Sequence, residues 1–489
     1  MAYDDVREYM DALEKWGELV RIEAEVDWNL EIGAVMRHSC EIGTPAAHFK
    51  KIRGYGPEYS VFGPPVARGS IATWSKVAIA MELDPEIPYH ALQREYMRRI
   101  SNPIKPYQVS TGPCKENIHV GKDVNLFKFP VPYIHEGDGG RYIATWAFTI
   151  TKDPDSDWTN WGVYRQMIHT RNRTGGLIWP QQHNGMMYYR KYEARNKPMP
   201  FATVIGCDPI CTIVGTIAFP AGVNEADMAG GIRQEPVQLV KCETNDLLVP
   251  ATAEIVIEGV VMPRERWDEG PFGEYTGYRA SPRMPRPVYR VECVTHRNNP
   301  VFTANCEGIP ITESHLACQS LGSCAQALLS FRDAGIPVRD AYVPPHSAGN
   351  GIVVAVKKDY AGIAHHIVGA SVAHKEGFRY LHTVICDDDV DVHDLNQVMH
   401  AFATKCNPRR GVQQKDYSVG WGLVPFLDLH ERQFAKGYTA AFDCTWPVEW
   451  DRFSEVPPKA SFSQAYPEEL QNAVIDNWTT KYGMPASGK

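Results

Sequence analysis

The segment Val288-Tyr-Arg-Val-Glu-Cys-Val-Thr295 alternates apolar and polar side chains, which is the pattern of a β-strand with one buried face. Other segments between residues 119 and 305 alternate or run apolar in the same way: Thr145–Thr151, Phe201–Ile205 and Ala253–Glu258. Asn298-Asn299-Pro300 supplies a turn. The stretch therefore predicts a β-rich barrel or sandwich.

The sequence before this stretch has mixed α/β character. Apolar residues recur at helical spacing over Val6–Trp16, a short strand follows at Leu19–Ile22, and Leu30–Cys40 is again helical in pattern. Prolines at positions 103, 106 and 113 interrupt this pattern. We therefore place a domain boundary within residues 101–113.

The sequence after the β-rich stretch predicts a long helix and then a second α/β region. The helix runs from Thr312 to Ala334, where Gly335 and Pro337 end it. Strands at Ile352–Val356 and Thr383–Cys386 then alternate with helices at 360–370 and 395–404. That alternation is typical of a separate α/β domain. A last helix, Pro467–Trp478, follows a long irregular stretch. A helix reached in this way often packs on a partner subunit, although it can also close its own domain.

Composition excludes several classes of protein. The 489 residues are 44% hydrophobic and 22% charged, as in an ordinary soluble protein of two or three domains. A net charge of −8 argues against nucleic-acid binding, and no apolar run approaches membrane-spanning length. The acidic start, Met1-Ala-Tyr-Asp-Asp5, does not resemble a signal peptide. The 12 cysteines form no Cys-x-x-Cys pair, which predicts reduced core thiols and a cytoplasmic protein.

The loop Asp268-Glu-Gly-Pro-Phe-Gly-Glu274 holds two carboxylates five residues apart. Pro271 restricts its own φ, whereas Gly270 and Gly273 permit backbone angles that other residues resist. Such a loop can fix Glu269 and Glu274 for proton transfer, with Arg165 bridging both carboxylates. From the residues alone, an exposed turn with two solvated glutamates and an ordinary surface ion pair remain open.

Asn160, His183 and Glu225 together form a mixed oxygen and nitrogen set that suits Mn²⁺ or Mg²⁺ better than structural Zn²⁺. Such a metal commonly clamps a phosphate, which Lys375 could also reach. Because these residues lie on separate segments, a core or surface histidine and a solvated lysine at a helix end are the alternatives.

Short motifs occur along nearly the whole chain, in the same order as in one enzyme family. They are Thr111-Gly-Pro-Cys-Lys-Glu-Asn117, Pro130-Val-Pro132 with Ile134-His135, Asp138-Gly-Gly140, Thr159-Asn-Trp161, Gln182-His183, Val240-Lys-Cys-Glu-Thr-Asn-Asp246, Glu269-Gly-Pro-Phe-Gly-Glu274 and Asp476-Asn-Trp-Thr479. The chain resembles the UbiD family of prenylated-flavin-dependent decarboxylases, and within it the branch of the fungal ferulic/cinnamic acid decarboxylases.

The resemblance implies a multidomain α/β fold. The implied parts are an N-terminal α/β region (1–110), a central split β-barrel that binds prenylated FMN (111–310), a linking helix (311–336) and a C-terminal α/β domain for oligomerisation (337–489). A homodimer is the implied assembly. A flavin prenyltransferase is the implied supplier of the cofactor.

The resemblance also assigns cofactor and metal ligands by position. Asn160, His183 and Glu225 match the ligands of a divalent metal, usually Mn²⁺, that bridges to the phosphate of prenylated FMN. A K⁺ ion is expected beside it, held by the carbonyls of Trp161, Val214 and Ile217 and by Glu225. Further cofactor contacts are expected from Arg165, Gln182, Thr216 and Lys375.

For catalysis, the resemblance implies a Glu269–Arg165–Glu274 network. The expected reaction is the reversible, non-oxidative decarboxylation of an α,β-unsaturated or (hetero)aromatic acid. Prenylated FMN forms a covalent adduct with the substrate and accepts electrons as CO₂ leaves. Glu274 then gives a proton to the carbon that carried the carboxylate, while Arg165 holds that carboxylate.

The expected substrate pocket departs from the fungal enzymes. Trp421 stands in place of Phe, Arg379 in place of Thr and Tyr275 in place of Met, with Leu423 close to Trp421 in sequence. These changes favour a substituted aromatic or heteroaromatic acid over a cinnamate, and Arg379 could meet a second anionic or polar group or face outward. A flavin-dependent oxidoreductase and a non-catalytic carrier of prenylated flavin are the competing functions.

Overall fold

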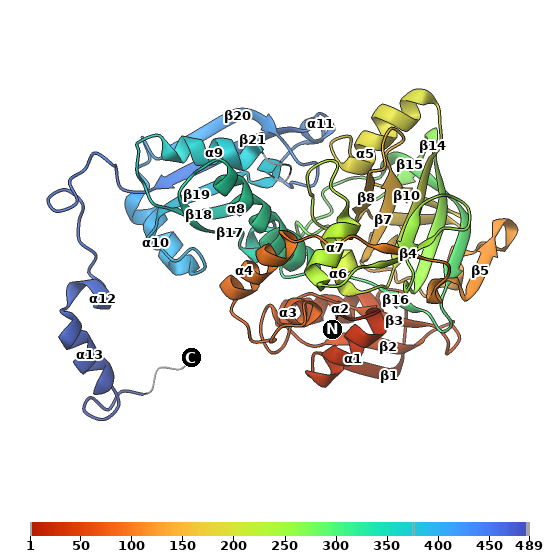
Figure 1. The fold of residues 1–489 in the computed structure, drawn as a ribbon, viewed down its shortest axis with the longest axis horizontal. Helices are drawn as coiled ribbons and strands as arrows, with labels where there is room; N and C mark the ends of the chain where they lie inside the picture. Colours follow the sequence, from red (N-terminus) through yellow and green to blue (C-terminus); the bar gives the residue numbers. More distant parts are fainter. Residues whose placement is uncertain (1, 374, 376, 486–489) are drawn as a thin grey trace.

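The computed structural model describes residues 2–373, 375 and 377–485, and its largest feature is an antiparallel sheet (Figure 1). In spatial order the sheet consists of β6 (Tyr142–Ala144), β9 (Gln166–Thr170), β10 (Arg173–Gly176), β15 (Met284–His296), β14 (Ile255–Glu269), β11 (Met199–Ile205), β7 (Ala147–Lys152) and β8 (Thr159–Gly162), with β5 (Asn117–Val120) also paired to β15. The predicted strands are confirmed as β7, β11, β14 and β15, and the sheet is a half-barrel rather than a sandwich.

The central sheet separates two hydrophobic cores. Phe148 and Ile150 of β7 enter one core, whereas Ala147 of the same strand enters the other. In β11, Val204 and Phe201 likewise point to opposite cores. Because both faces are covered, these strands run apolar instead of alternating with charged residues.

The N-terminal region forms a second sheet of β1 (Leu19–Val26), β2 (Ala46–Ile52), β3 (Ser60–Gly63) and β16 (Val301–Thr303). Its helices are α1 (Val6–Lys15), α2 (Glu31–Ile42), α3 (Ser75–Ala80) and α4 (Tyr89–Ile100). Asp5 caps α1 by accepting hydrogen bonds from the N–H groups of Arg7 and Glu8. β16 follows the β-rich stretch in sequence but pairs in parallel with β3, so it joins the two regions.

Three short helices and a small sheet pack at the side of the central sheet. The helices are α5 (His183–Met187), α6 (Pro209–Gly215) and α7 (Glu225–Arg233). The small sheet has the order β13 (Leu248–Pro250), β12 (Gln238–Lys241) and β4 (Tyr107–Val109). The first residues of α5 and α7 are His183 and Glu225, so two helix starts position two of the predicted ligands.

The predicted linking helix is continuous, but its first half is wound differently from the expectation. Ser314–Ser323 is a π-helix, and α8 (Cys324–Asp333) continues from it as an α-helix. Every residue from 315 to 323 is buried. A segment buried on all sides shows no amphipathic period, so sequence periodicity could not distinguish the two windings.

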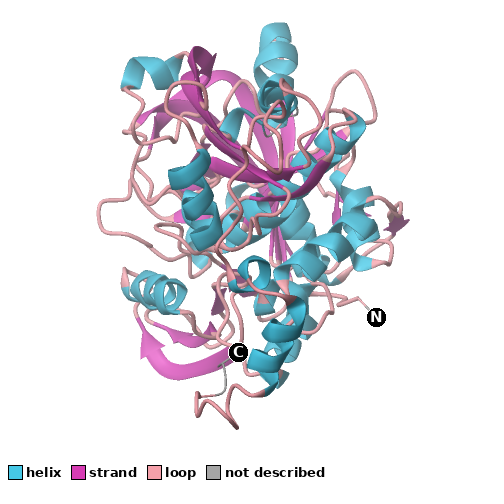
Figure 2. Ribbon diagram, turned by 90° about the vertical axis from the view of Figure 1, so that its left-hand side faces the viewer, coloured by secondary structure: helices cyan, strands magenta, loops and turns pink. Residues whose placement is uncertain are grey.

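The C-terminal region contains the sheet β17 (Val338–Tyr342), β18 (Gly351–Val356), β19 (His382–Asp387), β21 (Lys436–Cys444) and β20 (Val412–Val419). Its helices are α9 (Ile363–Ala373), α10 (Leu395–Lys405) and α11 (Leu429–Gln433). The predicted alternation of strands and helices is confirmed, because β18, β19 and β21 are parallel neighbours. Figure 2 views the molecule from this side and shows helices packed around the strands.

The last described residues extend away from the rest of the molecule and end in α12 (Phe462–Ala465) and α13 (Glu468–Asp476) (Figure 1). Leu470 and Ile475 of α13 are 48% and 60% exposed, so this helix covers no core of its own chain. All 12 cysteines are free thiols and all but Cys406 are buried, as the sequence predicts. Among the described residues, none of the helices combines the length and apolar character needed to traverse a bilayer.

Candidate active site

Arg165 binds the two predicted carboxylates at once. Its Nε and Nη2 each donate to one oxygen of Glu269 at 3.0 Å, and its Nη1 donates to Glu274 Oε1. Arg165 precedes β9, Glu269 is the last residue of β14, and Glu274 lies in the loop that leads to β15. The three side chains are at most 7% exposed. The exposed-turn alternative is therefore wrong, and the arrangement is the expected Glu-Arg-Glu network.

The loop that carries Glu274 is fixed by a second loop at residues 138–140. Asp138 accepts a hydrogen bond from Gly273 N at 2.9 Å, and Gly139 N donates to the Pro271 carbonyl at 2.7 Å. Tyr142 Oη donates to Glu269 Oε1 at 2.7 Å. These bonds hold the carboxylates in place without using the oxygen atoms of Glu274.

A methyl group at Gly139 should disturb this loop. A Cβ atom there would lie 2.1 Å from the Gly270 carbonyl oxygen, which is backbone and cannot rotate away. We expect Gly139→Ala to shift the 270–274 loop and lower kcat at least about 10-fold, because small misplacements of catalytic groups are costly. Gly369→Ala, on α9, is the control for adding a methyl group, since nothing lies within 4 Å of its Cβ and its backbone is not in the left-handed region. Equal rates in the two variants would contradict the positioning role, and thermal unfolding would show whether Gly139→Ala has simply unfolded.

Burial adjusts the charge states in the network. It raises the pKa of Glu274 to about 7, an effect that Arg165 opposes and that the nearby Glu307 carboxylate reinforces. The pKa of Arg165 is raised despite burial, because Glu269 and Glu274 stabilise its cation. Glu274 can therefore both hold and release a proton near neutral pH, which is what a general acid requires.

A cavity of about 130 Å³ opens beside Glu274. Its lining includes the predicted residues Arg165, Gln182, Thr216, Glu274, Tyr275, Arg379, Trp421 and Leu423. All four residues predicted for the substrate pocket are in this set, so Arg379 faces the cavity rather than solvent. Sequence reasoning missed the other residues of the lining: Thr145, Val163, Tyr164, Leu177, Trp179, Phe272, Glu307, Ser314, Cys318 and Gln319.

The predicted metal ligands lie on three elements. Glu225 is fully buried, accepts from Asn160 Nδ2 at 3.0 Å and from Trp161 N at 3.0 Å, and burial raises its pKa to about 8. Asn160 Oδ1 accepts from Tyr164 Oη at 2.9 Å. The structure thus brings Asn160, Trp161 and Glu225 into direct contact.

His183 lies near this cluster without bonding to it. Its ring packs edge-on against Trp158 at 4.8 Å, and Trp158 Nε1 donates to the Val223 carbonyl at 2.8 Å, two residues before Glu225. Burial, together with the charge of Lys375, lowers the pKa of His183 to about 3. The charge of Lys375 also opposes the rise in the pKa of Glu225, so Lys375 lies within electrostatic range of two predicted metal ligands.

The described part of the chain contains no group of three or more His, Cys, Asp or Glu side chains that could hold a metal ion. The predicted set contains only two such residues, because Asn160 supplies an amide. Val214 and Ile217, the predicted carbonyl ligands, lie at the end of α6, where the Val214 carbonyl accepts from Ile217 N at 3.0 Å.

Two residues around the network gave no distinctive sequence signal. Tyr142 comes two residues after the Asp138-Gly-Gly140 motif, and this spacing was the one available clue to its contact with Glu269. Glu307 accepts hydrogen bonds from Asn305 at 2.8 Å and Thr312 at 2.7 Å. Glu307 comes shortly after an apolar strand, and this position was only a weak indication that its side chain is buried in a polar site.

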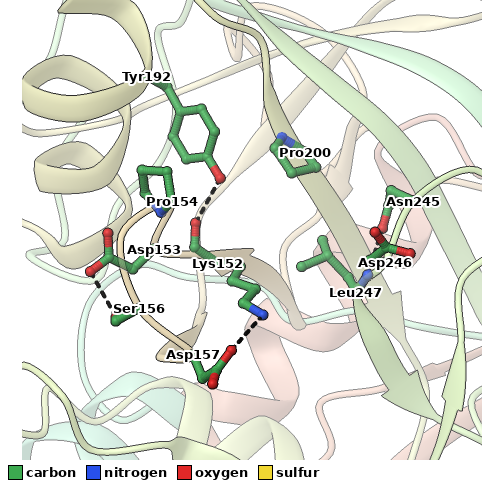
Figure 3. A pocket seen from close by; sticks show the side chains of 10 residues that line it. All are labelled: Lys152, Asp153, Pro154, Ser156, Asp157, Tyr192, Pro200, Asn245, Asp246 and Leu247. Carbon is green, nitrogen blue, oxygen red and sulfur yellow. Dashed lines mark hydrogen bonds and ion pairs between the residues drawn. The ribbon is translucent and has the colours of Figure 1, made fainter. Parts of the chain in front are cut away.

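Figure 3 shows a larger hollow, of about 620 Å³, formed in part by Lys152 and Tyr192. Its polar groups bond to one another: Tyr192 Oη donates to the Lys152 carbonyl at 3.0 Å, Ser156 donates to Asp153 at 2.9 Å, and Lys152 pairs with Asp157 at 3.1 Å. None of the predicted site residues that the structure describes lines it. Size alone therefore does not identify the active site.

Three family models match the chain in succession. They are the N-terminal domain (residues 10–96), the Rift-related domain (105–310) and the C-terminal domain (320–440) of 3-octaprenyl-4-hydroxybenzoate carboxy-lyase, the UbiD models. Together they cover most of the chain and reach all four sheets described above.

Two curated relatives match along nearly the full length. Pyrrole-2-carboxylic acid decarboxylase of Pseudomonas aeruginosa is 32% identical, and the alignment covers 98% of each chain. Ferulic acid decarboxylase 1 of Saccharomyces cerevisiae is 29% identical with the same coverage. The ferulic acid branch expected from the motifs is thus among the relatives, beside a decarboxylase of a heteroaromatic acid.

Solved structures agree with this relationship. Vanillic acid decarboxylase of Sedimentibacter hydroxybenzoicus in its closed form has a TM-score of 0.89 and 29% identity, covering 98% of this chain and 100% of that one. An evolved dimeric form of the UbiD-class enzyme HmfF of Pelotomaculum thermopropionicum, solved in complex with prFMN, has a TM-score of 0.75 and 30% identity, covering 93% and 97%. The chain belongs to the UbiD family of carboxy-lyases.

Proposed function

We propose that this enzyme catalyses the reversible, non-oxidative decarboxylation of an aromatic, heteroaromatic or α,β-unsaturated carboxylic acid with prenylated FMN as cofactor. The observation that carries the proposal is the buried Glu269–Arg165–Glu274 network, in which Glu274 lines a cavity and has its pKa raised to about 7 by burial. A cofactor carrier needs no proton donor here, and a flavin oxidoreductase gives no reason for the complete Glu269–Arg165–Glu274 network.

Arg165 and Glu274 supply the protein's part of the chemistry. The guanidinium of Arg165 is held by Glu269 and can orient the substrate carboxylate before the bond to CO₂ breaks. Glu274 then transfers its proton to the carbon that has lost CO₂, so the acid RCOO⁻ and one H⁺ become RH and CO₂. In the reverse direction the Glu274 carboxylate takes the proton from RH.

The residues around the cavity fit a flavin cofactor. Gln182 and Thr216 line it beside Arg165, and Lys375 lies near enough to the predicted metal ligands to act on their charge. When bound, prenylated FMN supplies the covalent electron sink that decarboxylation at an sp² carbon requires. The complex of the related HmfF with prFMN supports the same cofactor here.

Asn160, His183 and Glu225 fit a divalent metal such as Mn²⁺. Glu225 is a fully buried carboxylate that an adjacent cation would stabilise, and Nε2 of His183 is buried without a hydrogen-bond partner among the described residues. Their oxygen and nitrogen donors suit Mn²⁺ or Mg²⁺. The Trp161, Val214 and Ile217 carbonyls would hold K⁺ beside it.

Replacing the carboxylate of Glu225 by an amide should weaken metal binding. We expect Glu225→Gln to reduce the Mn²⁺ content of the purified protein at least about 10-fold and to reduce retained cofactor with it, because a charged ligand is lost. Elemental analysis and flavin absorbance give the two quantities. Asp227→Asn, on the same helix, is the matched control and should retain both. Wild-type Mn²⁺ content in Glu225→Gln would remove this residue from the metal site.

The decisive experiment is CO₂ release by protein co-expressed with a flavin prenyltransferase and supplied with Mn²⁺ and K⁺. We expect bound prenylated FMN by mass spectrometry and CO₂ from at least one aromatic or heteroaromatic acid. Unmodified FMN with NAD(P)H oxidation would instead favour an oxidoreductase. Bound prenylated FMN without CO₂ release or hydrogen exchange would favour a carrier.

We also propose a cytoplasmic homodimer with the domain division expected from the sequence. The exposed apolar residues of α13 support an assembly in which a second subunit covers them, and the 12 free thiols support a reducing compartment. Analytical ultracentrifugation of the full chain would test the dimer.

A further inference from the structure

One wall of the cavity carries polar groups that the proton-transfer network does not use. Trp179, Trp421 and Arg379 are linked there by ring contacts: the two indoles lie 6.2 Å apart, and the Arg379 guanidinium lies 4.9 Å from the Trp421 ring centre. Arg379 Nη1 is also 4.0 Å from the sulfur of Cys318, the neighbour of Gln319. Arg165, by contrast, lies 5.3 Å from the ring of Phe272. The cavity therefore has two arginines in separate surroundings.

Gln319 is the most informative residue of this wall. It is 1% exposed, and neither its amide nitrogen nor its amide oxygen has a hydrogen-bond partner in the described part of the chain. Gly349 packs against it so closely that a Cβ atom there would lie 2.7 Å from the Gln319 Cδ. A buried amide left unsatisfied costs about 1–3 kcal/mol, so an amide held in a cavity in this way indicates a ligand that completes its bonds.

Trp179 adds a second donor. The residue is 8% exposed, and its indole Nε1 is buried and makes no hydrogen bond with any residue that the structure describes. With the guanidinium of Arg379, the wall offers three kinds of N–H donor, one of them cationic, and a single amide acceptor. Such a set matches an anionic acceptor with two oxygens better than an apolar substituent, which would leave the Trp179 indole and the Gln319 amide unsatisfied.

We propose that Trp179, Gln319 and Arg379 form a subsite for a second carboxylate, and that the substrate is an aromatic or heteroaromatic dicarboxylic acid. One carboxylate is oriented by Arg165 and leaves as CO₂, and the other stays on the ring and is held by this subsite. The inference rests on the proposed function, because it takes the cavity beside Glu274 as the place of reaction. Leu177, Leu423 and the indole rings would contact the ring between the two carboxylates.

The test compares acids that differ only in the second carboxylate. Suitable pairs are benzoate and benzene-1,4-dicarboxylate, pyrrole-2-carboxylate and pyrrole-2,5-dicarboxylate, and cinnamate and 4-carboxycinnamate. With the holoenzyme, we expect the diacid of at least one pair to bind about 10- to 100-fold more tightly by calorimetry, and to have the higher kcat/KM, since hydrogen bonds to charged groups contribute this much. If every monoacid binds as well as its diacid partner, or no member of any pair binds, the inference is wrong.

Variants locate the effect in the wall. Arg379→Gln and, independently, Gln319→Leu should lower the ratio of diacid to monoacid affinity at least about 10-fold, and Arg379→Lys should recover part of it because the charge remains. Arg332→Gln, at a 67% exposed arginine on α8, should leave the ratio unchanged. An unchanged ratio in both wall variants, each still folded and loaded with cofactor, would overturn the inference. Affinity and CO₂ release are separate readouts, so a diacid that binds selectively but releases no CO₂ would contradict the proposed function and not the subsite.

Discussion

Glu274→Gln should abolish most of the decarboxylation while leaving the cofactor bound. The glutamine amide oxygen can still accept the hydrogen bond from Arg165 Nη1, but the side chain has no proton to transfer at neutral pH. General acid–base catalysis contributes about 10²- to 10⁴-fold, so we expect kcat to fall by that factor. CO₂ release and the exchange of solvent deuterium into the product would both be measured.

The pH dependence of the wild-type rate provides a further check on this role. Because burial raises the pKa of Glu274 to about 7, the side chain carries its proton below that pH and loses it above. The rate of decarboxylation should therefore decline as the pH rises through about 7, and the residual rate of Glu274→Gln should not show this decline. Asp268→Asn, an exposed residue of the same loop, is the control and should keep the wild-type rate. Normal turnover by Glu274→Gln would exclude Glu274 as the proton donor.

Arg165→Leu should cost both activity and stability. Removing the guanidinium leaves Glu269 and Glu274 as two buried carboxylates without their cation, and breaking a buried pair in this way typically costs about 3–5 kcal/mol. The loss should be greater at pH 8 than at pH 6, because at pH 6 Glu274 is protonated with or without Arg165, whereas at pH 8 the wild-type carboxylate is ionised and stabilised by a cation that the variant lacks. Urea unfolding at the two pH values measures this difference.

The control for Arg165→Leu is an ion pair that water reaches. Arg290 pairs with Glu265 at 2.6 Å, with Arg290 41% exposed, so Arg290→Leu should cost no more than about 1 kcal/mol. Arg165→Lys should lie between the two variants in stability, since an ammonium group keeps the charge but cannot bond both oxygens of Glu269 as the guanidinium does. A stability loss in Arg165→Leu as small as that in Arg290→Leu would show that the network does not stabilise the fold.

The sequence permitted good predictions where a single local pattern decides the structure. The strands β7 and β11 are apolar enough to be recognised without tertiary information, and the spacing of Glu269, Pro271 and Glu274 suffices to indicate a rigid loop with two carboxylates. Both the chemistry of a guanidinium and the resemblance to a family indicate Arg165 as their partner, and the structure places it there. Local pattern alone left the exposed turn open, because burial depends on residues 138–140, which are remote in sequence.

The cavity wall could not be predicted to the same extent. Trp179 and Gln319 lie in segments whose other residues are buried for packing, so nothing in the sequence marks them as facing a cavity. Arg379, by contrast, can be identified from the sequence, because it is a charged residue at a position where the fungal enzymes have a threonine. Which atoms lack partners is a property of the assembled side chains, and no periodicity encodes it.

The π-helical winding of Ser314–Ser323 determines which of its side chains reach the cavity. Ser314, Cys318 and Gln319 all line it, at spacings of four and five residues. In an α-helix, residues three and four apart share a face and the fifth turns away, whereas bonding from residue i to i+5 accommodates about one more residue in each turn. Deleting one residue from this segment would therefore change the recognition chemistry of the pocket without altering any residue that contacts the substrate. Insertions and deletions in this helix, as well as substitutions, could therefore change which acids such enzymes accept.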